Sequence, residues 1–173
     1  MKTIQLQTIE PKTYLIDSVL DVRPVIEIKL LHPDAKVPQY ATPGSAAVDL
    51  CALGWLDCDF ECHIIEPGTS MSINTGIAVS IHNPNIVGIV EGRSGLRFKN
   101  HVSPLSSGVI DSDYHGEIIV QLYNHGKYDY TVSYGDRIAQ MLFMPVIQPN
   151  FMVVSEFSTE TERGVNGIGS TGK

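Results

Sequence analysis

The sequence has 173 residues, of which 43 % are hydrophobic and 18 % are charged, and its formal net charge is -7. This composition is typical of one globular domain with a sizeable core, and it excludes a disordered or fibrous chain. The acidic balance argues against broad binding to nucleic acid or anionic membranes, and no apolar run approaches the roughly 20 residues of a membrane span.

Residues 1–24 precede the first clear strand pattern, and we interpret them as an N-terminal extension. The first five residues, Met1 to Gln5, lack the hydrophobic core of a signal peptide, so we expect a cytoplasmic protein.

Short strands are predicted along most of the remaining chain, because segments rich in β-branched and aromatic residues alternate with turns containing Gly, Pro, Asn or Asp. The predicted strands are 26–31, 46–52, 60–65, 70–75, 76–82, 86–91, 117–124, 128–133 and 137–145. Only 94–100 is predicted as a short helix. A strand about every ten residues indicates an all-β sandwich or barrel, which we place at 25–157.

The cysteines are Cys51, Cys58 and Cys62. Cys58, Cys62 and His63 have the spacing of half a zinc site, but the sequence has no second pair to complete the tetrahedron. An odd number of cysteines also argues against a disulfide framework, so we expect free cysteines on strands.

Two polar segments interrupt the first half of the strand pattern. Asp49 lies within an apolar run and needs a partner if it is buried, the alternative being an edge-strand carboxylate that faces water. Arg93, Ser94 and Gly95 start the predicted helix with a cation, a hydroxyl and backbone N–H donors, a pattern typical of an anion site. The alternative is a helix cap by Ser94 with a solvated Arg93.

Two more interruptions follow. The segment 108–117 carries three acids, and Asp111 directly follows Val109 and Ile110, which predicts partial burial of its carboxylate. Such a group suits a general base. A simple turn or a Ca²⁺ site are alternatives, although the ligand spacing of a calcium loop is missing. Gln140 lies in an apolar strand and must find hydrogen-bond partners.

The last segment, 158–173, is rich in glycine and ends on two hydroxyls and a lysine. It matches a dinucleotide fingerprint and most of a P-loop, but both patterns need a following helix, and the sequence ends at Lys173. We expect either a disordered terminus or a flexible arm that closes over a phosphate bound elsewhere.

In this order, the strings GSAAVDL, RSGL, GVIDSDYHGE, GDRIAQMLF and RG…GIGSTG resemble the five motifs of the homotrimeric dUTPase family. The resemblance implies a jelly-roll-like β-barrel with a flexible C-terminal arm and three active sites at the subunit interfaces of a homotrimer. It also implies Mg²⁺-dependent hydrolysis of dUTP to dUMP and pyrophosphate, which supplies dUMP for thymidylate synthesis and keeps uracil out of DNA.

The resemblance also implies roles for individual residues. Asp111 activates the attacking water, and Asp49 acts through waters on the metal. Tyr114 packs beneath the deoxyribose, and Ile119 lies near the base. The predicted substrate-binding residues are Arg93, Ser94, Gly95, Gly108, Val109, Ile110, Tyr114, Ile119, Gln140, Arg163, Ile168, Gly169, Ser170 and Thr171.

The sequence departs from the family pattern at two places. Ile168 stands where the arm of family members carries a phenylalanine that stacks on uracil. The stretch 103–107 stands where some relatives place an asparagine, so base recognition then rests on backbone groups or serines.

Two competing functions remain. A dCTP deaminase shares the fold but needs a glutamate where this sequence has Gln121. A non-catalytic regulatory β-barrel trimer would have no need for Asp111, Tyr114, Arg93 and Arg163 together.

Overall fold

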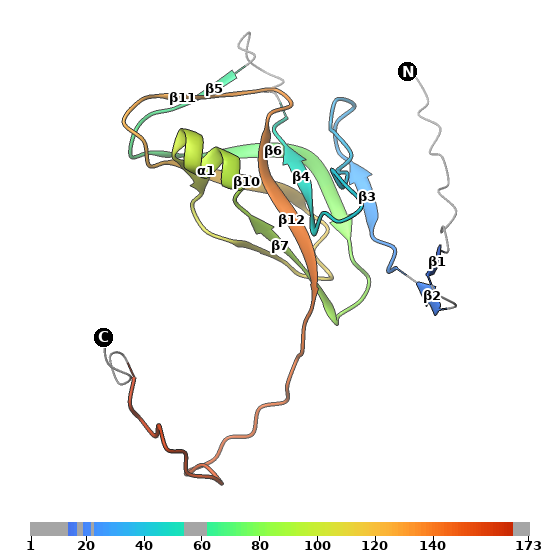
Figure 1. The fold of residues 1–173 in the computed structure, drawn as a ribbon, viewed down its shortest axis with the longest axis vertical. Coiled ribbons are helices and arrows are strands. Elements are labelled where there is room, and N and C mark those ends of the chain that lie inside the picture. The colour runs from blue at the N-terminus through green and yellow to red at the C-terminus, as the bar shows by residue number, and fades with distance from the viewer. Residues whose placement is uncertain (1–13, 17–18, 22, 54–61, 168–173) are drawn as a thin grey trace.

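The computed structural model describes residues 14–16, 19–21, 23–53 and 62–167, and its regular structure is almost entirely β (Figure 1). Two short strands, β1 (Tyr14–Ile16) and β2 (Val19–Asp21), pair antiparallel within the predicted N-terminal extension. No helix in the described part of the chain is long and apolar enough to cross a membrane.

Two four-stranded antiparallel sheets make up the body of the fold. The first has the strand order β3 (Glu27–Leu30), β6 (Ser70–Ser80), β10 (Glu117–Asn124) and β8 (Val102–Pro104). The second has the order β4 (Ala47–Cys51), β12 (Arg137–Pro145), β7 (Ile86–Glu91) and β9 (Gly108–Ile110). A separate pair joins β5 (Cys62–Ile65) to β11 (Tyr130–Ser133).

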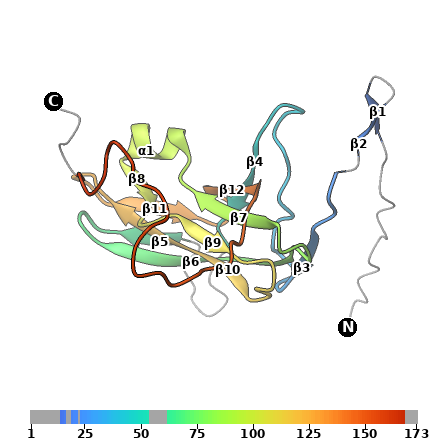
Figure 2. The same cartoon turned by 90° about the horizontal axis from the view of Figure 1, so that it is seen from below.

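One hydrophobic core lies between the sheets. Ile73 and Val120 of the first sheet pack in the same buried cluster as Leu50, Val90 and Met141 of the second. In Figure 2, β7 and β12 accordingly lie above β6 and β10. Alternating burial along β4, β7 and β10 shows how period-2 sequence patterns place one face of each strand in this core. The predicted all-β sandwich is confirmed.

The helix α1 (Ser94–Asn100) has the predicted bounds and follows β7 directly. It buries Leu96 and ends at His101, whose backbone adopts the left-handed conformation with φ 57° and donates to the last turn. Arg93 is the N-cap residue, and no side chain caps the helix. Ser94 therefore does not serve as the cap that the alternative interpretation assigned to it.

The two strands predicted at 70–75 and 76–82 form the single long strand β6. The boundary between the two predicted strands falls at Gly76, which adopts φ +69°. The chain nevertheless continues in the same sheet, since the register between β6 and β10 shifts at this point and accommodates the extra residues of β6.

Four short strands escaped the prediction, namely β1 and β2 in the N-terminal extension and β8 and β9 in the two sheets. β8 contains Pro104 at the edge of its sheet, and β9 occupies Gly108–Ile110 at the edge of the other. Each has three residues, too few for a visible alternation. The strand predicted at 128–133 is shorter and begins at Tyr130, and residues 60 and 61 of another predicted strand lie outside the described residues.

After β12 the chain leaves the sandwich, and residues 146–167 form neither helix nor strand (Figure 1). This tail, residues 146–167, is exposed from residue 147 onward. Its apolar side chains are exposed as well: Ile147, Phe151, Met152, Val153 and Phe157 are each at least 83 % accessible. A segment with this much uncovered apolar surface is typical of one that packs on another molecule.

Candidate active site

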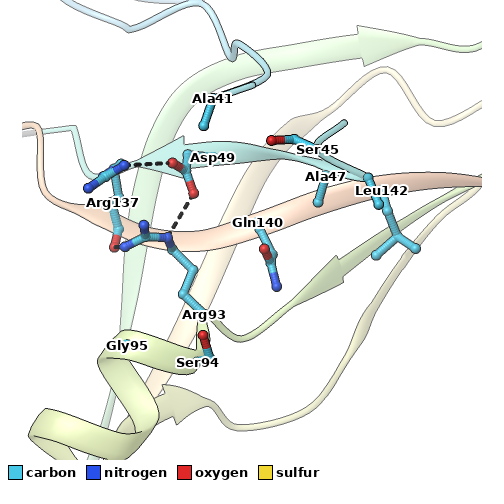
Figure 3. A pocket seen from close by; sticks show the side chains of 11 residues that line it. Ala41, Ser45, Ala47, Asp49, Arg93, Ser94, Gly95, Arg137, Gln140 and Leu142 are labelled. Atoms are coloured by element: carbon cyan, nitrogen blue, oxygen red, sulfur yellow. Dashed lines mark hydrogen bonds and ion pairs between the residues drawn. The ribbon is translucent and has the colours of Figure 1, made fainter. Parts of the chain in front are cut away.

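A polar pocket opens between β4, β12 and the start of α1 (Figure 3). Its volume is about 460 Å³, and it brings together residues from three of the motifs found in the sequence. Its lining consists of Ala41, Ser45, Ala46, Ala47, Asp49, Arg93, Ser94, Gly95, Arg137, Gln140 and Leu142.

The sheet register explains why these residues meet. β12 lies between β4 and β7, so that Gln140 is paired with Asp49 on one side and with Glu91 on the other. Arg93 follows β7 by two residues and leads into α1. The side-chain amide of Gln140 donates to the Gly92 carbonyl oxygen at 2.9 Å. The hydrogen-bond partner that the sequence required for Gln140 is therefore present.

Asp49 is held between two arginines. Nε of Arg93 donates to Oδ1 of Asp49 at 2.7 Å, and Nη1 of Arg137 donates to Oδ2 at 3.1 Å. Nη1 of Arg93 also donates to the Arg137 carbonyl oxygen at 3.2 Å. The side chains of Asp49 and Arg93 are only 21 % and 25 % exposed. The site is therefore partly shielded from water, and each of the two charges has a nearby partner of opposite sign there. The expectation that Asp49 needs a partner is confirmed, and Arg93 is not solvated on its own.

This arrangement leaves the pocket with an excess of positive charge. Two guanidinium groups face one carboxylate, and Ser94 and Gly95 add the first N–H groups of α1, which have no acceptor within the helix. Each arginine has five N–H donors, of which Asp49 and one carbonyl oxygen use only some. The remaining donors suit an anion with several oxygens, such as a phosphate chain.

Cys51 lies beside this cluster on β4. It is a free cysteine, as predicted, and burial raises the pKa of its thiol, an effect that Lys36 partly opposes. The raised pKa favours the protonated thiol, which is the poorly nucleophilic form. Cys58 lies outside the described residues.

A second group of predicted residues lies on β9 and in the tight turn that joins it to β10 of the other sheet, a segment (residues 108–117) that we call the hairpin. Gly108, Val109 and Ile110 form β9, which pairs with β7 at the sheet edge. Asp111 and Tyr114 lie in the turn that follows, where the Tyr114 N–H donates to the Asp111 carbonyl oxygen at 3.1 Å. None of these residues lines the pocket.

The predicted burial of Asp111 is wrong for the single chain. Asp111 is exposed, because β9 ends at Ile110 and the chain turns outward into solvent. Val109, which was expected to cover Asp111, is itself 62 % exposed. Tyr114 and Ile119 are also exposed, at 44 % and 52 %.

The third group belongs to the tail. Arg163 is exposed, and its Nε donates to the Asn166 carbonyl oxygen at 3.0 Å. Ile168, Gly169, Ser170 and Thr171 lie outside the described residues. One chain thus brings Asp49, Arg93, Ser94, Gly95 and Gln140 together and keeps the hairpin and the tail apart from them.

The prediction from sequence missed Arg137 as a residue of the site. A signal was available, since Arg137 adds a cation to the apolar strand that carries Gln140, but its contact with Asp49 depends on the pairing of β12 with β4. The small residues Ala41, Ser45 and Ala47, which give the pocket its room, carried no such signal.

The sequence profile of the dUTPase family matches residues 33–172. The chain is 41 % identical over 153 residues to the deoxyuridine 5'-triphosphate nucleotidohydrolase of Histophilus somni (strain 2336), a match that covers 86 % of this chain and 97 % of that protein. It is 42 % identical over 156 residues to the protein of the same name from Tolumonas auensis, with 86 % and 97 % covered.

Solved structures resemble the fold as well. A mutant dUTPase of Staphylococcus bacteriophage 80alpha with dUpNHpp superimposes with a TM-score of 0.76 at 27 % identity, covering 87 % of this chain and 100 % of that one. A mutant dUTPase from phage phi11 of S. aureus, described with a structural Mg(II) ion, gives a TM-score of 0.69 at 25 % identity, covering 78 % and 99 %.

Proposed function

The chain belongs to the dUTPase family, and from this premise we propose that it hydrolyses dUTP to dUMP and pyrophosphate at an active site shared between subunits. The observation that carries the proposal is the pocket in which Asp49 orients Arg93 and Arg137 beside Gln140 and the start of α1. The proposed role in the cell is to supply dUMP for thymidylate synthesis and to keep uracil out of DNA, acting in the cytoplasm.

The pocket is proposed to hold the triphosphate. Arg93 offers the donors that Asp49 leaves unused, and Ser94 and Gly95 add a hydroxyl and backbone N–H groups. The amide of Gln140 reaches the same pocket from β12. Because Asp49 and the Arg137 carbonyl oxygen fix the Arg93 guanidinium before substrate arrives, little side-chain entropy is lost on binding.

In the proposed reaction, Asp111 accepts a proton from a water whose oxygen attacks the α-phosphorus. The bond between this phosphorus and the bridging oxygen to the β-phosphorus breaks, and pyrophosphate leaves with the electron pair. Exposure of Asp111 in one chain suits this role only if the hairpin faces the pocket of another subunit, where water is partly excluded.

The same hairpin is proposed to select the nucleoside. Tyr114 packs beneath the deoxyribose and leaves no room for a 2′-hydroxyl, and backbone groups of Gly108, Val109 and Ile110 read the uracil edge. Exposure of Val109 on this edge strand and of Ile119 on β10 supports an apolar surface for the base.

The proposal includes Mg²⁺ bound with the triphosphate, where it neutralises phosphate charge. In the described part of the chain, no group of three His, Cys, Asp or Glu side chains lies close enough to hold a metal ion. A single carboxylate that lies among cationic side chains fits a metal ion that takes most of its ligands from phosphate and water. Asp49 retains lone pairs beyond its two arginine contacts, so it fits the predicted role of accepting hydrogen bonds from metal-bound water.

A homotrimer with interfacial active sites accounts for the separation of the three groups. The pocket, the hairpin and the tail lie apart in one chain, and the tail exposes apolar residues that need cover. We expect light scattering to give three times the 19.0 kDa mass of one chain. A monomer that turns over dUTP would contradict the shared site.

Pyrophosphate release from dUTP, dCTP, dTTP and UTP tests the function directly. We expect turnover of dUTP alone, and loss of turnover when EDTA removes Mg²⁺. Release of ammonia from dCTP would instead indicate a deaminase, although Gln121 donates to the Ser70 hydroxyl at 3.2 Å and its amide is no proton shuttle. No turnover of any nucleotide would favour the non-catalytic trimer.

Ile168 gives a prediction about the arm. Ile168→Phe should lower KM for dUTP by up to about tenfold, because aromatic stacking on a base contributes about 1–3 kcal/mol and isoleucine retains only part of it. Steady-state kinetics measure the change. Ile64→Phe, at an exposed isoleucine of β5, is the matched control, and an unchanged KM for Ile168→Phe would contradict a stacking position at residue 168.

A further inference from the structure

Glu117 is the first residue of β10, and both oxygens of its carboxylate accept hydrogen bonds from other residues of the chain. Oε1 accepts a hydrogen bond from the Gly76 backbone N–H at 2.8 Å, and Oε2 accepts one from the side-chain amide of Asn74 at 3.1 Å. Both partners lie on β6, more than forty residues earlier in the chain. The side chain therefore ties the end of the hairpin to the neighbouring strand.

The contact falls where the ladder between β6 and β10 is irregular. Glu117 pairs with Ala78 and Ile119 pairs with Asn74, so β6 contains two more residues than β10 over this stretch. Gly76, at φ +69°, lies within the irregularity, where its buried N–H bonds to the Glu117 carboxylate. The carboxylate thus satisfies a buried donor that would otherwise cost about 1–3 kcal/mol.

Gly76 itself is closely packed. A Cβ atom at this position would lie 2.8 Å from Cβ of Ala35 and 3.0 Å from a methyl carbon of Leu53. Its carbonyl oxygen accepts a hydrogen bond from the Leu31 N–H at 2.8 Å. The anchor for Glu117 is therefore a rigid part of the sandwich.

The backbone of Glu117 is linked in turn to Tyr114. The Tyr114 hydroxyl donates to the Glu117 carbonyl oxygen at 3.0 Å. The Tyr114 side chain lies directly over Gly116, where a Cβ atom would come within 2.9 Å of the hydroxyl oxygen and two ring carbons. Two neighbours thus fix the ring: a glycine that leaves it room and a carbonyl group that Glu117 holds in place.

We propose that Glu117 is a positioning residue that holds the Tyr114 ring in the position where the ring excludes a 2′-hydroxyl. The Glu117 carboxylate thereby sets the preference for deoxyribonucleotides. This inference rests on the proposed function, in which Tyr114 packs beneath the sugar. Glu117 itself touches no substrate. The carboxylate fixes the position of the Glu117 backbone, and the Glu117 carbonyl oxygen in turn accepts the hydrogen bond that holds the Tyr114 hydroxyl.

The test compares kcat/KM for dUTP with kcat/KM for UTP. Glu117→Ala should lower this ratio by about tenfold, the factor that corresponds to one hydrogen bond of ordinary strength. Tyr114→Phe keeps the ring and the Glu117 carboxylate but lacks the hydroxyl donor, so it should lower the ratio by a similar factor. A role in stability alone would reduce turnover of both nucleotides equally and leave the ratio unchanged.

Glu117→Gln is the rescue variant. Its amide oxygen accepts from the Gly76 N–H, and its NH₂ group donates to the Asn74 side chain once that amide is turned, so the wild-type ratio should persist. Glu66→Ala, at an exposed residue of the turn before β6, is the control for loss of a carboxylate.

Three outcomes overturn the inference: an unchanged ratio in folded Glu117→Ala, an unchanged ratio in Tyr114→Phe, or a reduced ratio in Glu117→Gln. Tyr114→Phe decides the matter if Glu117→Ala does not fold, because an exposed hydroxyl is removed without disturbing the core. Failure of the wild type to turn over dUTP would reject the proposed function instead, so the two failures are distinguishable.

Discussion

Asp111→Asn should abolish dUTP turnover and leave both the fold and nucleotide binding intact. Asparagine has the shape of aspartate but cannot accept a proton, and a positioned general base contributes about a hundredfold to ten-thousandfold to the rate. The side chain is exposed in one chain, so its replacement leaves no buried group unpaired. We therefore expect the whole effect in kcat, with an unchanged affinity for a non-hydrolysable dUTP analogue.

Stopped assays of pyrophosphate release give kcat, and calorimetry gives the affinity. Asp113→Asn is the matched control, since Asp113 is an exposed acid two residues away in the same turn. It should retain wild-type turnover. If Asp111→Asn keeps more than about a tenth of the wild-type kcat, Asp111 is not the general base.

Local patterns predicted the strands well, because each strand buries one face in a common core. Leu50, Val90 and Met141 lie on three of the predicted strands and are buried in that core. The need for a partner at Asp49 was also predictable, since a carboxylate in an apolar strand is costly when unpaired. The identity of both partners was not, because it depends on how β12 lies beside β4.

The failures share a physical cause, which is dependence on contacts that are distant in sequence. Burial of Asp111 was judged from Val109 and Ile110, but an edge strand cannot cover the residue after it. Two separate strands were predicted on either side of the boundary at Gly76, whereas a carboxylate from Glu117 holds Gly76 within the single strand β6. Neither contact leaves a trace in the nearby sequence.

Deletion of residues 163–173 should also abolish turnover without unfolding the protein. The deleted segment contains Arg163, one of the predicted substrate-binding residues, which we propose closes over the γ-phosphate. Its described part, residues 163–167, is exposed and includes no residue of the core cluster, so truncation leaves that cluster intact. Thermal unfolding should be unchanged, and pyrophosphate release should fall below detection. Full activity of the truncated protein would leave the tail as a terminus without function.

The two inactive variants together test whether each site is shared between subunits. Asp111→Asn chains have an intact arm, and truncated chains have an intact Asp111. If a site takes its hairpin and its arm from different chains of a trimer, every mixed trimer contains one site with both parts.

Random mixing of equal amounts makes about three quarters of the trimers mixed, each with one working site in three, so about a quarter of wild-type activity should return. A site built within one chain predicts no recovery, since each chain then carries its own defect. Exposure of both Asp111 and the tail in the single chain favours recovery.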